Sequence, residues 1–196
     1  NNPTGCFVRR GPFVFGADAQ RPVLGHNTPP TVLTLRVPGA AAPIHVGVGH
    51  YSFNSPPDRH REAFGFTRLV DKVKLDRRPA EDEGPALAPD ESSDPGWSAC
   101  WLLSDSNELP EEEGELVPHR DWASLTDDVH RVHRAELLPD GTWRAYTNVD
   151  QVMHNARMYD AARWAAHQGQ LQALAPTAGR ALPDQGGPCR IDHVRM

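Results

Sequence analysis

The stretch WSACWLLSDSNELP, residues 97–110, decides the fold. Its first seven residues, 97–103, are apolar apart from one serine, which is typical of a largely buried β-strand. The strand runs directly into a polar segment, in which Asp105 and Asn107 lie two residues apart and so share one side of an extended chain. A buried strand that ends in a carboxylate and an amide predicts a sheet with a polar site at its edge.

Further strands are predicted on both sides of this stretch. Residues 31–37 alternate and are rich in β-branched side chains, and residues 44–50 place apolar side chains on one face. We expect these two strands to be neighbours, with His50 where the second one ends. The other predicted strands cover residues 5–10 and 13–15 around a Gly-Pro break, residues 142–147, and residues 189–194.

Helices and loops are expected between the strands. In residues 58–74, Phe66, Leu69, Val70 and Val73 have the spacing of one helical face, which predicts an amphipathic helix. Its remaining, solvent-exposed face would carry Arg59, Arg61, Glu62, Arg68 and Lys72. Shorter helices are predicted over 127–136 and 158–167, and acidic surface loops over 76–96 and 111–115. This order of elements predicts a mixed α/β fold.

Composition limits the classes of function. The formal net charge of −6 argues against a protein that coats DNA through a basic surface, but it allows an enzyme that holds one phosphate locally. The cysteines, Cys6, Cys100 and Cys189, form no CxxC pair, which favours free thiols and a reducing, cytoplasmic location. No apolar run approaches the roughly 18 residues that cross a bilayer, so no membrane span is expected. No obligate protein partner is indicated.

Four residues are candidates for a catalytic or binding role, and each could instead have an ordinary structural role. His50 ends a strand, where a histidine is commonly structural or solvated. Asp105 and Asn107 could hold a hard cation, a phosphate oxygen or a water, or could form an ordinary Asx-rich turn. Asp192 lies within an apolar strand and needs a partner, which could be an arginine, a histidine that it orients, or a metal.

The order of these pieces resembles the endonuclease/exonuclease/phosphatase superfamily, the deoxyribonuclease-I-like enzymes. The matching pieces are His50-Tyr51, the helix around Arg61-Glu62-Ala63, the stretch 102–110 with its Asp-x-Asn, and Arg190-Ile191-Asp192. Residues 160–163 with 176–179 are similar to what precedes the last of these motifs in bacterial members. The resemblance covers nearly the whole chain and implies a four-layer sandwich of two packed mixed sheets flanked by helices.

The resemblance also implies roles for the four candidates. His50 would assist proton transfer or stabilise charge at the phosphate, and Asp105 would orient or deprotonate the attacking water. Asn107 would hold a phosphate oxygen, and Asp192 would orient a catalytic histidine. Family members use Mg²⁺ (or Mn²⁺) to hydrolyse a phosphodiester or phosphate ester. The implied partner is a phosphate-ester substrate, with nucleic acid among the candidates.

The chain departs from the family pattern at several points. Ser104 stands where the family has a glycine. The family's metal-binding glutamate, an early asparagine and a Ser-Asp-His triplet have no counterpart in this sequence. We therefore expect residues 1–196 to be one incomplete domain that lacks N-terminal strands and the final strand, as a fragment of a longer enzyme. The alternative is a catalytically inactive binding domain of the same fold.

The sequence offers candidates for two other kinds of site. His130 and His133 would share a helical face beside Asp127 and Asp128, which could form a zinc or iron site, although a solvated helix face is the simpler interpretation. The five tryptophans are scattered rather than grouped with basic residues, so core packing explains Trp101 and Trp143 better than base stacking does.

Overall fold

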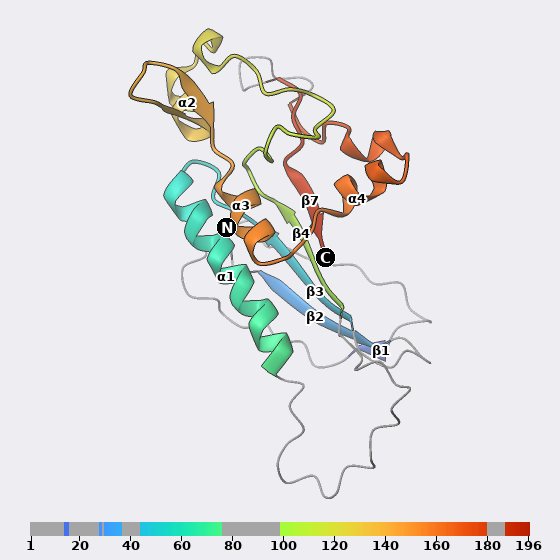
Figure 1. Ribbon diagram of the computed structural model, residues 1–196. Helices are drawn as coiled ribbons and strands as arrows, with labels where there is room; N and C mark the ends of the chain where they lie inside the picture. Colours follow the sequence, from blue (N-terminus) through green and yellow to red (C-terminus); the bar gives the residue numbers. More distant parts are fainter. Residues whose placement is uncertain (1–13, 16–27, 29, 37–43, 76–98, 180–186) are drawn as a thin grey trace, which may run out of the picture.

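The computed structural model describes residues 14–15, 28, 30–36, 44–75, 99–179 and 187–196. Its main sheet has five strands in the order β1-β2-β3-β4-β7, and a separate two-stranded sheet is formed by β5 and β6 (Figure 1). The strands are β1 (Val14–Phe15), β2 (Thr31–Arg36), β3 (Ile44–His50), β4 (Ala99–Asp105), β5 (Ala135–Leu137), β6 (Trp143–Ala145) and β7 (Asp192–Arg195). The helices are α1 (Pro56–Leu75), α2 (Asp128–Arg134), α3 (Asn148–Asn155) and α4 (Ala161–His167), with 3-10 turns η1 (Trp122–Ser124) and η2 (Leu171–Leu174).

The sheet contains both parallel and antiparallel strand pairs. Strands β3 and β4 are parallel and are joined through α1, whereas β1–β2, β2–β3 and β4–β7 pair antiparallel. The predicted neighbours at 31–37 and 44–50 do pair with each other, as β2 and β3. The mixed α/β class is therefore confirmed. Within the described residues one five-stranded sheet is present beside the β5–β6 hairpin, and the second large sheet of a four-layer sandwich stays a prediction.

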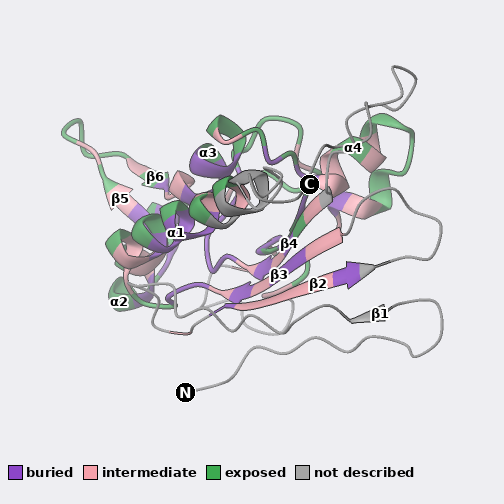
Figure 2. Cartoon of the chain, turned by 90° about the horizontal axis from the view of Figure 1, so that it is seen from below, coloured by how far each residue is buried: buried purple, intermediate pink, exposed green. Residues whose placement is uncertain are grey.

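Helices α1 and α3 lie on the same side of the sheet (Figure 2). They enclose a core that includes Tyr51, Phe66, Leu102 and Met153, all at most 2% exposed. Helix α1 approaches β3 closely at Gly49, where a Cβ atom would lie 2.1 Å from the Phe66 ring. Only glycine leaves room for this ring, and the packing fixes the strand end that carries the candidate residues.

A second core lies where the chain continues past β4. The segment after β4, η1 and the β5–β6 hairpin bury Leu109, Trp122, Leu125, Ala135, Ala145 and Ile191. Figure 1 shows the hairpin and α2 beyond the end of the sheet at which β4 stops. This unit therefore stands over the carboxyl ends of β3 and β4.

Several expectations about individual elements were wrong. Arg59 and Glu62 were assigned to the solvent face of α1, but both are fully buried, because they meet buried partners beyond the end of the sheet. Trp101 was expected in the core, yet it is 40% exposed. Helix α3 was not predicted, and the helix predicted from residue 158 begins at Ala161 with Asp160 as its N-cap.

Other predictions are confirmed or fall outside the described residues. Trp143 packs against the second core, and Cys100 and Cys189 are free thiols, as expected. None of the helices in the described part of the chain has the length and apolarity to cross a bilayer. Of the strand predicted at 13–15, residues 14 and 15 form β1. The predicted strand at 5–10, residue 13, the loop at 76–96, Cys6 and Trp97 lie outside the described residues.

Candidate functional site

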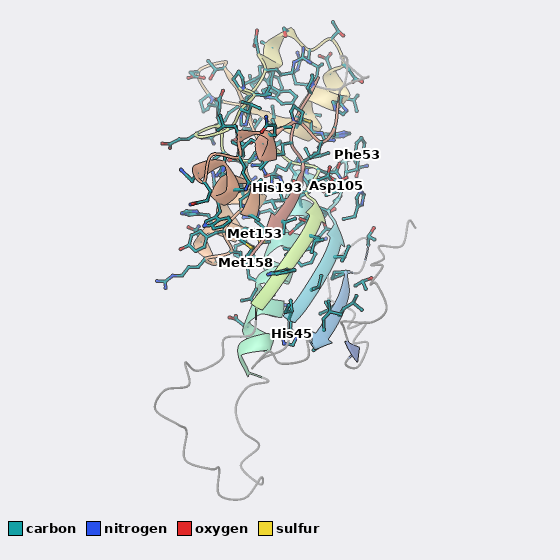
Figure 3. The ribbon with its side chains drawn as sticks, turned by 90° about the vertical axis from the view of Figure 1, so that its right-hand side faces the viewer. His45, Phe53, Asp105, Met153, Met158 and His193 are labelled. Atoms are coloured by element: carbon teal, nitrogen blue, oxygen red, sulfur yellow. The ribbon has the colours of Figure 1, made fainter. Side chains whose placement is uncertain are left out.

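Three adjacent strands bring three of the four candidate residues to one edge of the sheet. His50, the last residue of β3, pairs with Asp105, the last residue of β4, and Asp105 pairs in turn with Asp192, the first residue of β7. Figure 3 shows Asp105 at this end of the sheet near Phe53, with His45 at the opposite end. The sequence separates these residues by as many as 142 positions, and the strand register places them side by side.

The fourth candidate, Asn107, joins them through a tight turn. Its backbone adopts a left-handed conformation with φ of 50°, which asparagine tolerates better than most residues. The Asn107 backbone N–H donates to Asp105 Oδ1 at 2.9 Å, and Ser106 N–H donates to the Ile191 carbonyl at 2.8 Å. The expected Asx turn is therefore present, and it serves to point the Asn107 amide back toward the strand ends.

The Asn107 side chain connects β3 to this turn. Its Nδ2 donates to the Tyr51 carbonyl at 3.0 Å and lies 3.2 Å from His50 Nε2. His50 Nε2 also lies 3.5 Å from Asp105 Oδ2. The His50 and Asp105 side chains remain 41% and 31% exposed, so a ligand from solvent can reach both. The arrangement combines an imidazole, a carboxylate and an amide on one accessible surface.

Several neighbouring groups shift the pKa of the Asp105 carboxyl group. Partial burial raises the pKa of its carboxyl group, and the carboxylate of Asp192 raises it further, while the Asn107 backbone N–H, His50 and Arg134 act in the opposite direction. Like charges directly opposite in a strand pair destabilise a sheet. A cation bound at this edge would offset the repulsion between the carboxylates of Asp105 and Asp192.

Asp192 does not have the buried position that was expected for it. Its side chain is exposed, and it is the following residue, His193, that points into the protein and is 5% exposed. The strand period of two explains the difference, because Ile191 and His193 face inward and Asp192 faces outward. Asp192 therefore needs no buried partner and is available at the site edge.

Arg134 is a site residue that the sequence did not single out. It is the last residue of α2, its Nη1 donates to the Asn107 carbonyl, and its Nη2 lies 3.4 Å from Asn107 Oδ1. The guanidinium stands 5.3 Å from the centre of the Phe53 ring. Burial, with Arg59 nearby, lowers its pKa. Among the described residues no carboxylate lies within ion-pair distance of Arg134, so its charge is available to an anion.

A buried ion pair connects the elements that surround the site. Arg59 Nε donates to Glu108 Oε2 at 2.8 Å, with both side chains at most 1% exposed. Arg59 also donates to the His133 carbonyl at 2.6 Å, and Glu108 Oε1 accepts from Val149 N–H. The pair thus ties α1, α2, α3 and the turn after β4 together. The sequence signal was Glu108 itself, directly after Asn107, but nothing in the sequence indicated its partner.

A second cluster of buried charges holds β7 against α3 and α4. Asp160 accepts from Arg190 Nη1 at 2.8 Å, and Asp150 lies 2.5 Å from Arg195 Nη2. Glu115, assigned to an exposed acidic loop, has a side chain only 4% exposed and bonds Arg190 and Arg163. These pairs fix the strand that carries Asp192.

The residues at the sheet edge suit a hard cation. No group of three His, Cys, Asp or Glu side chains arranged to hold a metal occurs in the described parts of the chain. Mg²⁺, however, needs only one or two carboxylates and completes its shell with water and substrate phosphate oxygens. The opposed carboxylates of Asp105 and Asp192 fit that requirement.

The alternative histidine site is not supported by the geometry. His130 is buried at 6% exposure, so the expectation that it is a solvated residue was wrong. Both His130 and His133 have their rings near Phe53, at 6.1 and 6.3 Å between ring centres. Asp127 caps α2 by accepting from His130 N–H, and Asp128 pairs with Arg131. These side chains organise α2.

No known protein-family model matches this chain, and no curated protein sequence matches it. The case for a function consequently depends on the arrangement of His50, Asp105, Asn107, Asp192 and Arg134.

Proposed function

We propose that this protein is part of a metal-dependent hydrolase that cleaves a phosphate ester or phosphodiester, with the deoxyribonuclease-I-like sandwich fold of the endonuclease/exonuclease/phosphatase superfamily. The observation that carries the proposal is the meeting of His50, Asp105 and Asp192 through strand register, with Asn107 bonded between them.

The proposed roles follow from the chemistry of each side chain. Asn107 offers an amide and Arg134 a guanidinium with no carboxylate partner among the described residues, and together they bind a phosphate oxygen. Asp105 accepts a proton from, or orients, the attacking water. His50, within 3.5 Å of Asp105, assists proton transfer or stabilises charge on the phosphate.

Mg²⁺ (or Mn²⁺) is the cofactor that fits the site. Asp105 and Asp192 would hold it, with water and the substrate supplying the other ligands. When bound, the ion would offset the negative charge of the phosphate as the ester bond breaks. The same ion would offset the repulsion between the two carboxylates.

The proposal is tested with the full-length protein that contains these residues. Release of phosphate or of the alcohol from phosphate monoesters and diesters is measured with Mg²⁺ and with EDTA. We expect Mg²⁺-dependent hydrolysis that Asp105→Asn lowers by at least about 100-fold, in the range general for lost acid–base catalysis. Binding of phosphate without any Mg²⁺-dependent turnover would instead support the second candidate, an inactive binding domain.

A further inference from the structure

Phe53 is an exposed aromatic side chain next to the candidate site. It is 47% exposed, although it directly follows the buried residues Tyr51 and Ser52 in the loop between β3 and α1. Figure 3 shows it near Asp105, at the end of the sheet where the candidate residues meet. Single exposed apolar side chains are ordinary on protein surfaces, so the surroundings of Phe53 decide whether it has a binding role.

The backbone that carries the Phe53 ring is fixed by buried contacts. Arg59 Nη1 donates to the carbonyls of Ser52 and Phe53, at 3.3 and 3.2 Å. Ser52 N–H donates to Glu62 Oε2 at 2.7 Å, and both Arg59 and Glu62 are fully buried. A side chain on a segment held in this way loses little conformational freedom when it binds a ligand, which favours a pre-organised binding surface.

Phe53 also lines a cavity of about 550 Å³. Asn107 and Arg134 line the same cavity, and Leu109 and Trp122 add apolar surface to it. The volume falls in the range of small-molecule pockets, roughly 300–1,000 Å³. The guanidinium carbon of Arg134 lies only 5.3 Å from the centre of the Phe53 ring. A ligand whose phosphate contacts Arg134 therefore has the Phe53 ring and the apolar cavity wall within reach of its organic group.

We propose that Phe53 determines substrate specificity by stacking on an aromatic ring of the substrate, which is a small phosphate ester with that ring next to its phosphate. This inference rests on the proposed function, because it takes the phosphate to lie at Asn107 and Arg134. The ring lies against Phe53 and the rest of the organic group enters the apolar cavity. Aromatic rings gain stability from each other in offset-stacked or edge-to-face contacts, beyond the gain from burying apolar area.

Two ligands of equal charge separate stacking from simple apolar burial. Phenyl phosphate and cyclohexyl phosphate carry the same phosphate and a ring of similar size, but only the phenyl ring is flat and aromatic. Binding of each to the full-length protein is measured by calorimetry with EDTA present, so that no turnover occurs. We expect phenyl phosphate to bind about two- to tenfold more tightly, as one aromatic pair would give. Equal affinity, tighter binding of cyclohexyl phosphate, or no binding of either ester would overturn the proposal.

A second exposed phenylalanine provides the matched control. Phe64, on α1, is 53% exposed and has its ring 5.1 Å from that of His60, but it does not line the cavity. Phe53→Leu keeps apolar bulk without an aromatic face and should abolish the preference for phenyl over cyclohexyl phosphate. Phe53→Tyr and Phe64→Leu should both retain that preference. If Phe53→Leu retains it as well, the substrate ring lies elsewhere and the proposal fails.

A nucleic acid strand that places one base on Phe53 is the competing arrangement. A short single-stranded DNA is therefore added to the same measurements. We expect it to bind more weakly than phenyl phosphate. Tighter binding of the DNA, with a loss of its affinity in Phe53→Leu, would put a nucleobase on this ring and overturn the assignment to small esters. The preference between the two rings is read from binding alone, so a protein that shows it without Mg²⁺-dependent hydrolysis would contradict the proposed reaction and still support the role of Phe53.

Discussion

Asp105 and Asp192 face each other as directly opposed residues of the antiparallel β4–β7 pair. Two carboxylates in this position repel each other, and part of the resulting cost is visible in the raised pKa of Asp105. Asp105 accepts from the Asn107 N–H within the Asx turn, but neither carboxylate forms an ion pair with lysine or arginine among the described residues. A cation bound between the carboxylates of Asp105 and Asp192 would offset their repulsion and account for their opposed positions.

The first prediction is that activity and stability change in opposite directions at Asp105. Asp105→Asn keeps an oxygen that can accept from Asn107 N–H but removes the repulsion, so the free energy of unfolding at neutral pH should rise by up to about 1 kcal/mol. Hydrolysis should be lost. Urea denaturation without metal, beside an activity assay, checks both. A lower stability would show that the carboxylate is needed structurally.

The pH dependence of that stabilisation has a definite sign. Because the folded-state pKa of Asp105 is raised above its unfolded value of about 4, its contribution to stability is fully present below that unfolded value and is lost as pH rises through the folded pKa. The stability difference between Asp105→Asn and the unmodified protein should therefore grow with rising pH. Asp140→Asn is the control of opposite sign, since hydrogen bonds from Thr142 lower the pKa of Asp140.

The second prediction concerns the buried pair beneath the site. Arg59→Met would leave Glu108 buried without its cation, so the free energy of unfolding should fall by about 3–5 kcal/mol. Arg61→Met is the matched control two residues along α1, because the Arg61 side chain is 58% exposed and pairs with Asp58 near the surface. The free energy of unfolding of Arg61→Met should differ from that of the unmodified protein by no more than about 0.5 kcal/mol. Similar losses for both variants would contradict a special role for Arg59.

Much of this site followed from the sequence, and the missing parts have physical reasons. His50, Asp105 and Asn107 sit where predicted strands end, so periodicity located each of them at a strand end. Their meeting at one edge was implied only by the family resemblance and follows from the β3–β4 pairing. Arg59 was misassigned because helical spacing gives the face of a residue but not the buried carboxylate that it meets.

The parts around β7 show a different limit of sequence reasoning. Arg134 is brought to Asn107 by the chain that passes from β4 through η1 to α2, which no local pattern encodes. Asp192 was placed on the wrong face because its strand is only four residues long. In so short a segment, alternation of apolar and polar residues gives little information on register.

The third prediction uses the buried histidine of β7. Burial lowers the pKa of His193, and Arg195 and Arg190 lower it further, against the opposing effect of Asp160, whose Oδ2 lies 3.2 Å from His193 Nδ1. The unfolded chain therefore takes up a proton first as pH falls below about 6.5, and the free energy of unfolding should fall through that range. Asp160, whose pKa the neighbouring His193, Arg195 and Arg190 hold far below its usual value, stays ionised there.

A variant isolates this contribution. His193→Gln can still donate to Asp160 but cannot titrate, so the loss of stability between about pH 6.5 and the folded-state pKa should become smaller. His167→Gln, on the exposed end of α4, serves as the control and should follow the unmodified protein. Chemical denaturation at several pH values gives the slopes. An unchanged slope in His193→Gln would mean that this ring does not lose protons on folding.

The fourth prediction tests whether Arg134 binds the substrate phosphate. Its guanidinium is partly buried, bonds the Asn107 carbonyl and has no ion-pair partner in the described part of the chain, so a phosphate would gain a charge-assisted hydrogen bond there. Arg134→Gln should weaken binding of inorganic phosphate by about tenfold or more, the equivalent of roughly 1.5–3 kcal/mol. Arg144→Gln removes a cation that already pairs with Glu136 on the surface and should leave binding unchanged. Because Arg134 also packs on Phe53, Arg134→Lys separates charge from shape: it should recover part of the phosphate affinity if charge matters, and none if the loss comes from disturbed packing.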